Sequence, residues 1–168
     1  MRDTSLRTSK ARVSHPFQKR NTRQASGENS TERSKTLSTY EYLADKILDS
    51  GVDKCSCVVS LGGGVVNNIA GFLASSIYRG LTLVHFSTTL MGQVDAAIDF
   101  KQAVNHSCGK NLLGCYYPAE RIILDPACLR SQSDRHLRNG LAEALKHGMV
   151  WERGVFLFAV FGQRFGVQ

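Results

Sequence analysis

The sequence lacks paired cysteine motifs and long apolar runs. Its cysteines are odd in number, show no CxxC spacing and lie at Cys55, Cys57, Cys108, Cys115 and Cys128. This pattern argues against a zinc knuckle and a disulfide framework, and it favours a reducing compartment. Cys55 and Cys57 lie two apart in a strand-like run and are expected to be buried as small apolar side chains. No apolar stretch is long enough to span a bilayer, so we expect a soluble protein without a membrane partner.

Acidic residues are scarce at the start of the chain. Residues 1–24 hold seven Lys or Arg against Asp3 alone, which contributes +6 to the formal net charge of +7. A nucleic-acid footprint lies on a folded surface, beside aromatic residues or within a recognisable module, and neither feature is evident. Nucleic acid is therefore not an expected partner.

Residues 1–27 are rich in Arg, Ser and Thr and show no apolar periodicity, so we expect a disordered basic tail there. Two interpretations of this tail remain open. An organelle transit peptide has this composition and would place the protein in a plastid or mitochondrion. A solvated tail, or translated sequence foreign to the folded protein, would leave the protein cytoplasmic.

One α/β domain is expected over residues 28–150, followed by an uncertain, divergent segment at 151–168. Apolar residues recur at helical spacing after Ser38, with Ser38 or Thr39 as the expected N-cap and Gly51 just beyond the helix end. Further strands are expected at 57–61, 81–86 and 121–125, and further helices between Gly64 and Gly80 and over 134–150. This alternation predicts a largely parallel sheet.

Two loops after expected strands carry groups suited to phosphate. Gly62-Gly63-Gly64 lies between a strand and a helix, where backbone N–H groups can approach an anion. Ser87-Thr88-Thr89 directly follows the next strand, so the two loops should lie side by side. Triple glycines also occur as flexible turns, and the glycines alone leave both interpretations open.

Charged residues gather between positions 95 and 111, in a segment otherwise filled by Val, Ala and Ile. They are Asp95, Asp99, Lys101 and Lys110, with Asn111 beside them. Charged side chains in apolar surroundings are usually paired or functional. One interpretation is recognition of anions or hydroxyls. The other is two structural salt bridges on a helix and its following loop.

Glu143, Lys146 and His147 lie at i, i+3 and i+4 on one expected helix. Glu143 and His147 could supply two metal ligands one turn apart, although an exposed, salt-bridged face is the favoured interpretation for His147. Glu143 is the one credible metal ligand.

Taken together, these residues resemble the 3-dehydroquinate synthase family of sugar phosphate cyclases over about residues 28–149. The matching strings are Leu61-Gly-Gly-Gly-Val-Val, Ala70-Gly-Phe, Tyr78-Arg-Gly, Thr88-Thr-Leu, Val94-Asp, Lys101 with Val104-Asn105, Gly109-Lys-Asn-Leu, Asp125-Pro and Gly140-Leu-Ala-Glu-Ala-Leu-Lys146. The resemblance implies part of a Rossmann-like, parallel-sheet NAD-binding domain, without most of the C-terminal helical metal-binding domain. It also implies a lyase that uses NAD and a divalent metal, Zn or Co, to oxidise a sugar phosphate, eliminate phosphate and close a carbocycle.

The resemblance implies roles for individual residues. The residues that it implies in NAD binding are Glu32, Lys35, Gly63, Gly64, Val65, Asn68, Thr88, Thr89 and Lys110. The residues that it implies in catalysis and in binding the sugar-phosphate substrate are Arg79, Asp95, Lys101, Asn111 and Lys146. Glu143 is the implied metal ligand. In relatives the arginine reaches into a neighbouring subunit's site, which implies a homodimer.

The chain departs from the family pattern at several positions. Asn68 replaces an aspartate, and Asp99-Phe100 replaces Gly-Gly. Lys101-Gln-Ala-Val-Asn and Tyr116-Tyr-Pro are closer to the 2-deoxy-scyllo-inosose synthase branch, which acts on glucose 6-phosphate. The family's two metal-binding histidines are absent, and a single carboxylate cannot hold a catalytic metal. We therefore expect this chain alone to be inactive, and a non-catalytic nucleotide-binding or dimerisation remnant stays an alternative.

Overall fold

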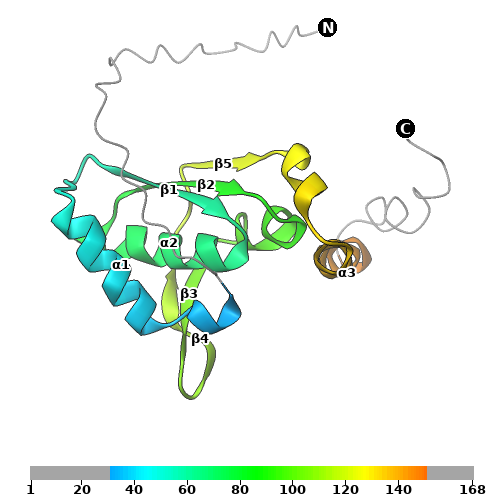
Figure 1. Ribbon diagram of the computed structural model, residues 1–168, viewed down its shortest axis with the longest axis horizontal. Coiled ribbons are helices and arrows are strands. Elements are labelled where there is room, and N and C mark those ends of the chain that lie inside the picture. The colour runs from blue at the N-terminus through cyan, green and yellow to red at the C-terminus, as the bar shows by residue number, and fades with distance from the viewer. Residues whose placement is uncertain (1–30, 151–168) are drawn as a thin grey trace, which may run out of the picture.

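The computed structural model describes residues 31–150, so the tail expected at 1–27 and the segment at 151–168 lie outside the described residues. Its centre is a parallel sheet in the order β1-β2-β5, formed by β1 (Cys57–Gly62), β2 (Thr82–Ser87) and β5 (Arg121–Leu124). Helices α1 (Leu37–Asp49) and α2 (Gly64–Ser76) lie along one face of this sheet (Figure 1). The expected α/β fold is confirmed.

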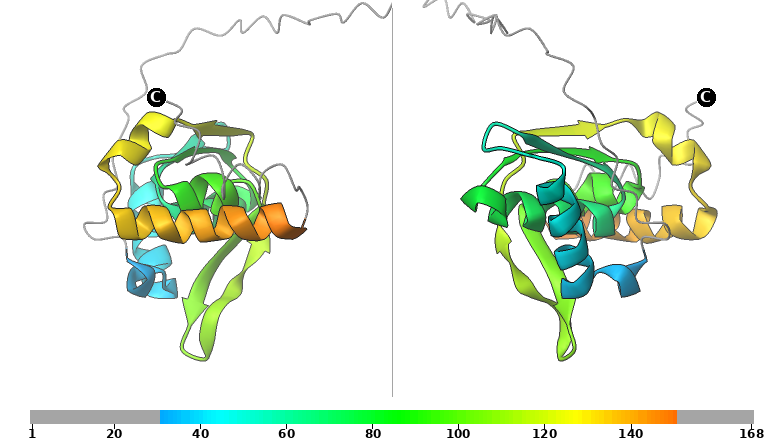
Figure 2. Two further views of the ribbon diagram at one scale, coloured as in Figure 1. Left: turned by 90° about the vertical axis from the view of Figure 1, so that its right-hand side faces the viewer. Right: turned by 60° about the vertical axis from the view of Figure 1, so that its left-hand side comes forward.

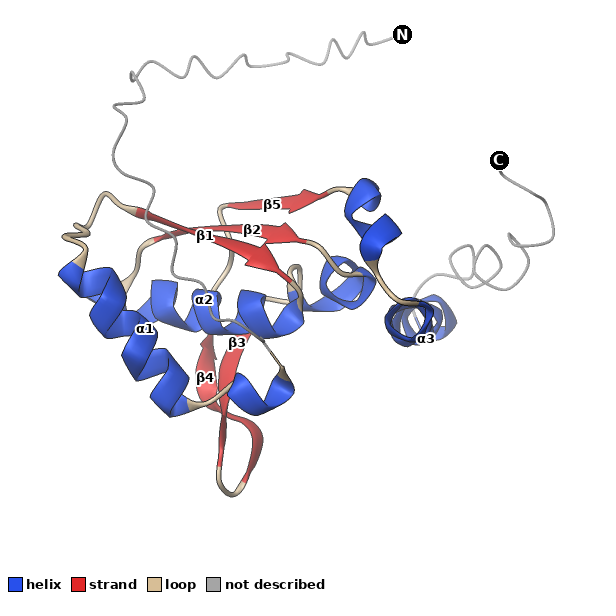
Figure 3. Ribbon diagram, viewed as in Figure 1, coloured by secondary structure: helices blue, strands red, loops and turns tan. Residues whose placement is uncertain are grey.

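A β-hairpin lies on the other side of α2, so this helix is enclosed between the sheet and the hairpin (Figure 3). The hairpin consists of β3 (Lys101–His106) and β4 (Gly109–Tyr116), paired antiparallel. The interpretation of this segment as a helix and its following loop is therefore wrong. The turn at Ser107-Cys108 lacks the Asn-Gly or Asp-Gly signature of a tight hairpin, and this hid the two strands from the sequence pattern.

The hydrophobic core lies around α2. Its buried members are Ile69, Leu73, Ile77, Leu81 and Val104, and they come from α2, the chain that follows it, and β3. The helical stripe expected on the preceding helix packs against them through Tyr40, Leu43, Ala44 and Ile47. Residues at spacings of three and four share one helix face, and α2 and α1 bury these faces against one another and the sheet.

Helix α1 begins earlier than the sequence pattern predicts. Its N-cap is Thr36, whose Oγ1 accepts a hydrogen bond from the backbone N–H of Thr39 at 3.2 Å. The expected caps Ser38 and Thr39 are already inside the helix, so that prediction is wrong. A threonine side chain can cap only the N–H groups two or three residues ahead of it, and Thr36 is correctly spaced for the first free N–H groups.

The outer face of the parallel sheet is open to solvent among the described residues. Val59 and Leu61 on β1 are 63% and 66% exposed. Cys57 on the same face is also exposed, as is Cys55 in the preceding loop, so the expected burial of both cysteines is wrong. Alternate residues of a strand point to opposite faces, and only the face toward α2 is covered.

The carboxyl ends of β1, β2 and β5 point toward η3 (Gly92–Ala96) and the long helix α3 (Asp134–Val150), which lie at that end of the sheet (Figures 1 and 2). Gly140 allows α3 to approach closely, because a Cβ at this position would lie 2.7 Å from Leu90 Cβ and from the Met91 nitrogen. None of the helices within residues 31–150 is long and apolar enough to cross a membrane.

A buried chain of polar side chains ties the two sheets together through α2. Ser60 Oγ donates to Asn67 Oδ1 at 3.0 Å, and Asn67 Nδ2 donates to Ser87 Oγ at 3.3 Å. Ser60 Oγ therefore accepts from His85 Nδ1, 2.7 Å away, which leaves His85 Nε2 as an acceptor facing Gln102 Nε2 at 3.5 Å. Burial lowers the pKa of His85, consistent with this neutral form.

Candidate functional site

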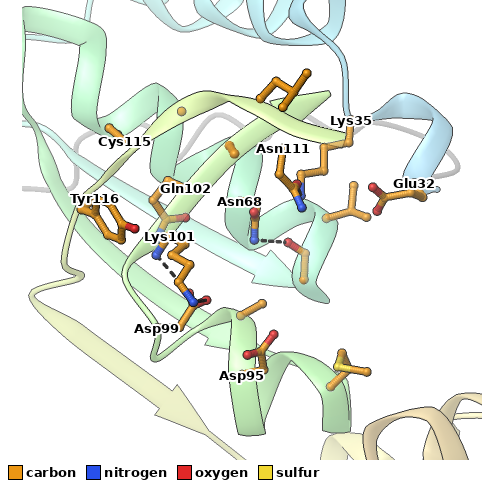
Figure 4. A pocket seen from close by; sticks show the side chains of 17 residues that line it. Glu32, Lys35, Asn68, Asp95, Asp99, Lys101, Gln102, Asn111, Cys115 and Tyr116 are labelled. Carbon is orange, nitrogen blue, oxygen red and sulfur yellow. Dashed lines mark hydrogen bonds and ion pairs between the residues drawn. The ribbon is translucent and has the colours of Figure 1, made fainter. Parts of the chain in front are cut away.

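A cleft of about 590 Å³ lies between the start of α2, η3, the hairpin and η1 (Glu32–Ser34) (Figure 4). It brings together candidate residues that are far apart in the sequence: Glu32, Lys35, Gly64, Val65, Asn68, Asp95, Lys101 and Asn111. These residues come from both the set expected at NAD and the set expected at substrate. The cleft is therefore the candidate active site.

The start of α2 lines this cleft through Gly64, Val65 and Asn68, and the first N–H groups of a helix have no partner within the helix. Its N-cap, Gly63, makes no side-chain capping hydrogen bond, and the first turn holds no acidic residue. A helix start without a capping side chain leaves N–H donors and a positive dipole end for an anion. This end of the cleft is suited to a phosphate group.

The glycine loop and the Thr88-Thr89 loop lie side by side, as the sequence predicts. The backbone N–H of Thr88 donates to the carbonyl of Gly62 at 2.9 Å. A Cβ on Gly63 would lie 2.9 Å from Thr89 Cγ2, so glycine is needed for the two loops to meet. Thr88 and Thr89 themselves flank the helix start rather than line the cleft.

Lys35 places a buried ammonium on the cleft wall. The residue is 5% exposed, and its Nζ donates to Asn111 Oδ1 at 2.5 Å. Burial lowers the pKa of Lys35. The negative charges of Glu32 and Asp99 raise it in part, and the positive charge of Lys110 lowers it further. Lys35 lines the cleft, whereas Lys110 is not among the residues that line it.

Asn105 holds this corner of the cleft together, and sequence reasoning assigned it no role. Its Nδ2 donates to Glu32 Oε1 at 3.0 Å, its backbone N–H donates to the Lys35 carbonyl at 2.8 Å, and its Oδ1 accepts from the N–H of Asn111 at 3.0 Å. Asn111 adopts a φ of 57°, which asparagine tolerates better than most residues. The sequence pointed to Asn105 only through the Val104-Asn105 string, one of the strings that carry the family resemblance.

The opposite wall of the cleft is acidic. Asp99 Oδ2 lies 3.4 Å from Lys101 Nζ, so a salt bridge does form in this segment, although Lys101 lies on β3 and not on a helix. Burial raises the pKa of Asp95, and the nearby carboxylates of Asp99 and Glu143 raise it further. Phe100 has a φ of 60°, a left-handed conformation that favours glycine and that a bulky residue adopts only under strain.

Helix α3 brings Glu143, Lys146 and His147 to the edge of this acidic wall. The Lys146 ammonium contacts the Glu143 carboxylate, and this hydrogen bond raises the pKa of Lys146. His147 Nε2 lies 3.3 Å from Glu143 Oε1. One ligand atom from each of Asp95, Glu143 and His147 can be chosen so that all three lie within 4.8 Å of one another. Sequence reasoning paired Glu143 with His147 but did not foresee Asp95 beside them.

Arg79 is not brought to the cleft. It ends η2 (Ile77–Arg79), which follows the C-terminal end of α2, whereas the cleft lies at the N-terminal end. A helix of 13 residues is about 20 Å long, so the two ends are well separated. Within one chain, Arg79 cannot reach the other candidate residues.

Residues 27–139, more than half of the chain, match the 3-dehydroquinate synthase N-terminal family. The chain belongs to this family. It is 42% identical over 125 residues to the 3-dehydroquinate synthase of Pelotomaculum thermopropionicum, covering 74% of this chain and 34% of that relative. It is 45% identical over 116 residues to the 2-deoxy-scyllo-inosose synthase of Streptomyces paromomycinus, covering 69% of this chain and 30% of that relative.

Solved structures of sugar phosphate cyclases share the fold of this chain. The 2-epi-5-epi-valiolone synthase of Streptomyces hygroscopicus subsp. jinggangensis 5008, with NAD⁺ and Zn²⁺ bound, has a TM-score of 0.77 and 36% identity over 82% of this chain and 39% of that chain. A 2-deoxy-scyllo-inosose synthase complexed with carbaglucose-6-phosphate, NAD⁺ and Co²⁺ has a TM-score of 0.67 and 36% identity over 70% of this chain and 32% of that chain. The chain thus spans about a third of the length of the curated relatives it matches.

Proposed function

We propose that this chain is the cofactor-binding part of an NAD-dependent sugar phosphate cyclase, a carbon–oxygen lyase that eliminates phosphate. The observation that carries the proposal is the cleft itself, where an uncapped helix start and a buried lysine face an acidic wall with its own lysine. Relatives with bound NAD⁺ and a divalent metal support the same assignment.

The residues present fit both groups. The free N–H donors at the start of α2 fit a pyrophosphate, and the ammonium of Lys35 with the carboxylate of Glu32 fits ribose hydroxyls. Asp95, Glu143 and His147 offer oxygen and nitrogen donors to a divalent ion. When bound, NAD would take and return the hydride and the metal ion would polarise the substrate oxygen, which is chemistry that no side chain supplies.

The chain's own residues orient the substrate in this proposal. Lys101 projects an ammonium into the cleft and neutralises a phosphate, while Asn111 presents polar atoms to a hydroxyl. Lys146 adds a second cation from α3. Because Arg79 lies about one helix length away, its proposed substrate contact requires a second copy of the chain, and a homodimer is part of the proposal.

Glucose 6-phosphate is the substrate that the charges favour over a heptulosonate phosphate. The cleft is lined by the carboxylates of Glu32, Asp95 and Asp99 against the ammonium groups of Lys35 and Lys101. A substrate carrying a carboxylate as well as a phosphate would meet this acidic wall with unfavourable charge. A neutral sugar ring with one phosphate avoids that repulsion.

Binding of sugar phosphates in the presence of NAD tests the proposal without requiring turnover. We expect glucose 6-phosphate to bind the NAD-saturated chain in calorimetric titrations, and Lys101→Met to weaken it about tenfold or more by removing a charged hydrogen-bond donor. Lys54→Met, at an exposed loop position outside the cleft, is the matched control and should leave affinity unchanged. The proposed substrate class would be refuted if none of the three candidate compounds binds: glucose 6-phosphate, sedoheptulose 7-phosphate and the heptulosonate phosphate.

A further inference from the structure

One acidic residue, Asp99, contacts Lys101 at two points on the cleft wall. Its Oδ1 accepts the backbone N–H of Lys101 at 3.0 Å, and its Oδ2 lies 3.4 Å from Lys101 Nζ. The Asp99 side chain is 22% exposed, whereas that of Lys101 is 64% exposed. The carboxylate is therefore the more covered partner of the pair, and the ammonium is the partner open to a ligand.

The backbone around Asp99 fixes this carboxylate in place. Asp99 lies at the end of the turn that follows η3, where its N–H donates to the Asp95 carbonyl at 3.1 Å. The next residue, Phe100, has a φ of 60°, and its carbonyl accepts from the Tyr117 N–H at 2.8 Å. A bulky residue keeps such a φ only where its surroundings enforce it. The position of Asp99 is thus set by main-chain hydrogen bonds before and after it.

The charge of Asp99 acts on other groups that line the cleft. In Figure 4 its side chain lies between those of Lys101 and Asp95. Burial lowers the pKa of Lys35 and raises that of Asp95, and the Asp99 carboxylate raises both. A carboxylate that raises the pKa of a lysine and of an acid contributes a negative potential at each of them. Asp99 therefore makes the cleft more negative from Lys35 to Asp95.

Asp99 also decides the balance of charge in the cleft lining. The carboxylates of Glu32, Asp95 and Asp99 outnumber the ammonium groups of Lys35 and Lys101. Without Asp99 the two kinds of charge would be equal in number. A ligand with one phosphate can be neutralised by the open Lys101 ammonium, but a second anionic group meets an excess of carboxylates. The charge of Asp99 thus discriminates between ligands with one anionic group and ligands with two.

We propose that Asp99 is a specificity-determining residue that selects sugar phosphates without a carboxylate against those that carry one. It does so by occupying one side of the Lys101 ammonium and by repelling a second anionic group. The inference rests on the proposed function, since it concerns the substrate of the same cleft. It goes beyond the general acidity of the wall, because it assigns the selection to one residue at a position where the chain departs from the family pattern.

Paired binding measurements with two seven-carbon sugar phosphates test this role. Sedoheptulose 7-phosphate lacks a carboxylate, and the heptulosonate phosphate carries one. Calorimetric titration of the full 168-residue chain, saturated with NAD, gives the ratio of the two affinities. We expect the unmodified chain to prefer sedoheptulose 7-phosphate, and Asp99→Asn to reduce this preference at least about fivefold, because one negative charge beside the ligand is lost. Asp45→Asn, which removes an exposed charge on α1, should leave the ratio unchanged.

Further variants separate the charge of Asp99 from its shape. Asp99→Asn keeps an oxygen that can accept the Lys101 N–H, so it removes the charge with little change in volume. Asp99→Glu keeps the charge and should keep the preference for sedoheptulose 7-phosphate. Far-UV circular dichroism verifies that each variant is folded. If Asp99→Asn does not fold, Asp99→Ser replaces it, because the serine hydroxyl can also accept this hydrogen bond.

The outcomes separate this inference from the proposed function. An unchanged ratio in Asp99→Asn would overturn the role of Asp99 and leave the proposed function intact, since both sugar phosphates would still bind. Loss of the preference in Asp99→Glu, or a preference of the unmodified chain for the heptulosonate phosphate, would also overturn it. If neither compound nor glucose 6-phosphate binds, the proposed function fails together with the inference that rests on it.

Discussion

Replacing Gly114 by alanine is expected to lower the free energy of unfolding by about 2–4 kcal/mol. Gly114 lies on β4 opposite Ala103, and a Cβ there would lie 2.1 Å from the Gln102 carbonyl oxygen and 2.6 Å from Ala103 Cβ. Because the first of these contacts is to the backbone, rotation of a side chain cannot relieve it. The hairpin would have to separate, and Gly114 itself lines the cleft.

Gly109→Ala is the matched control for this substitution. Gly109 begins the same strand, but its added Cβ would meet only the side chain of Leu112, with Cδ1 nearest at 3.3 Å, and Leu112 is 58% exposed and free to move. We expect a change of less than about 1 kcal/mol for this variant. Urea unfolding followed by circular dichroism measures both, and equal midpoints for the two variants would contradict the close strand contact.

Acid should destabilise the protein through His85 before the carboxylates titrate. The folded-state pKa of His85 lies below its ordinary value because the ring is buried, whereas in the unfolded chain the ring titrates near about 6.5. Below that pH the unfolded state binds more protons, so stability is present above about pH 6.5 and is lost as pH falls toward the folded-state pKa. The slope can reach about 1.4 kcal/mol per pH unit.

Unfolding at pH 7 and pH 5 measures this effect, and His85→Gln should lose the His85 part of the slope. His136→Gln, which changes an exposed histidine, should keep it. If His85→Gln does not fold, NMR titration of the His85 ring in the unmodified chain replaces it. A ring that titrates at or above its ordinary pKa in the folded state would contradict the neutral, buried histidine.

The parallel part of the fold was predictable because its signals are local. Apolar runs at 57–61 and 81–86 mark strands, and the Gly62-Gly63-Gly64 and Ser87-Thr88-Thr89 segments that follow them do meet as expected. The hairpin was not predictable in the same way. Its inward side includes Gln102, which is 1% exposed, and the burial of a polar residue depends on the partner strand and α2.

The candidate site was predictable as a set of residues but not as an arrangement. Short motifs named Lys35, Asp95 and Lys101, yet only the folded chain shows that they face one cleft. The role of Asn105 in linking Glu32 to Asn111 depends on contacts across 73 and 6 positions of the sequence. His147 was expected on an exposed, salt-bridged face, and its Nε2 does lie 3.3 Å from Glu143 Oε1. Helical spacing alone does not reveal that Asp95 lies near both residues.

Calorimetric titration of the full chain with NAD tests the central claim most directly, using Lys35→Met and Lys46→Met as a matched pair. We expect the unmodified chain to bind NAD and Lys35→Met to bind at least about tenfold more weakly, because a charged donor is lost from the cleft wall. Lys46 lies exposed on α1, and its replacement should leave the affinity unchanged. No NAD binding by the unmodified chain, or equal affinities for the two variants, would contradict the assignment of this cleft to NAD.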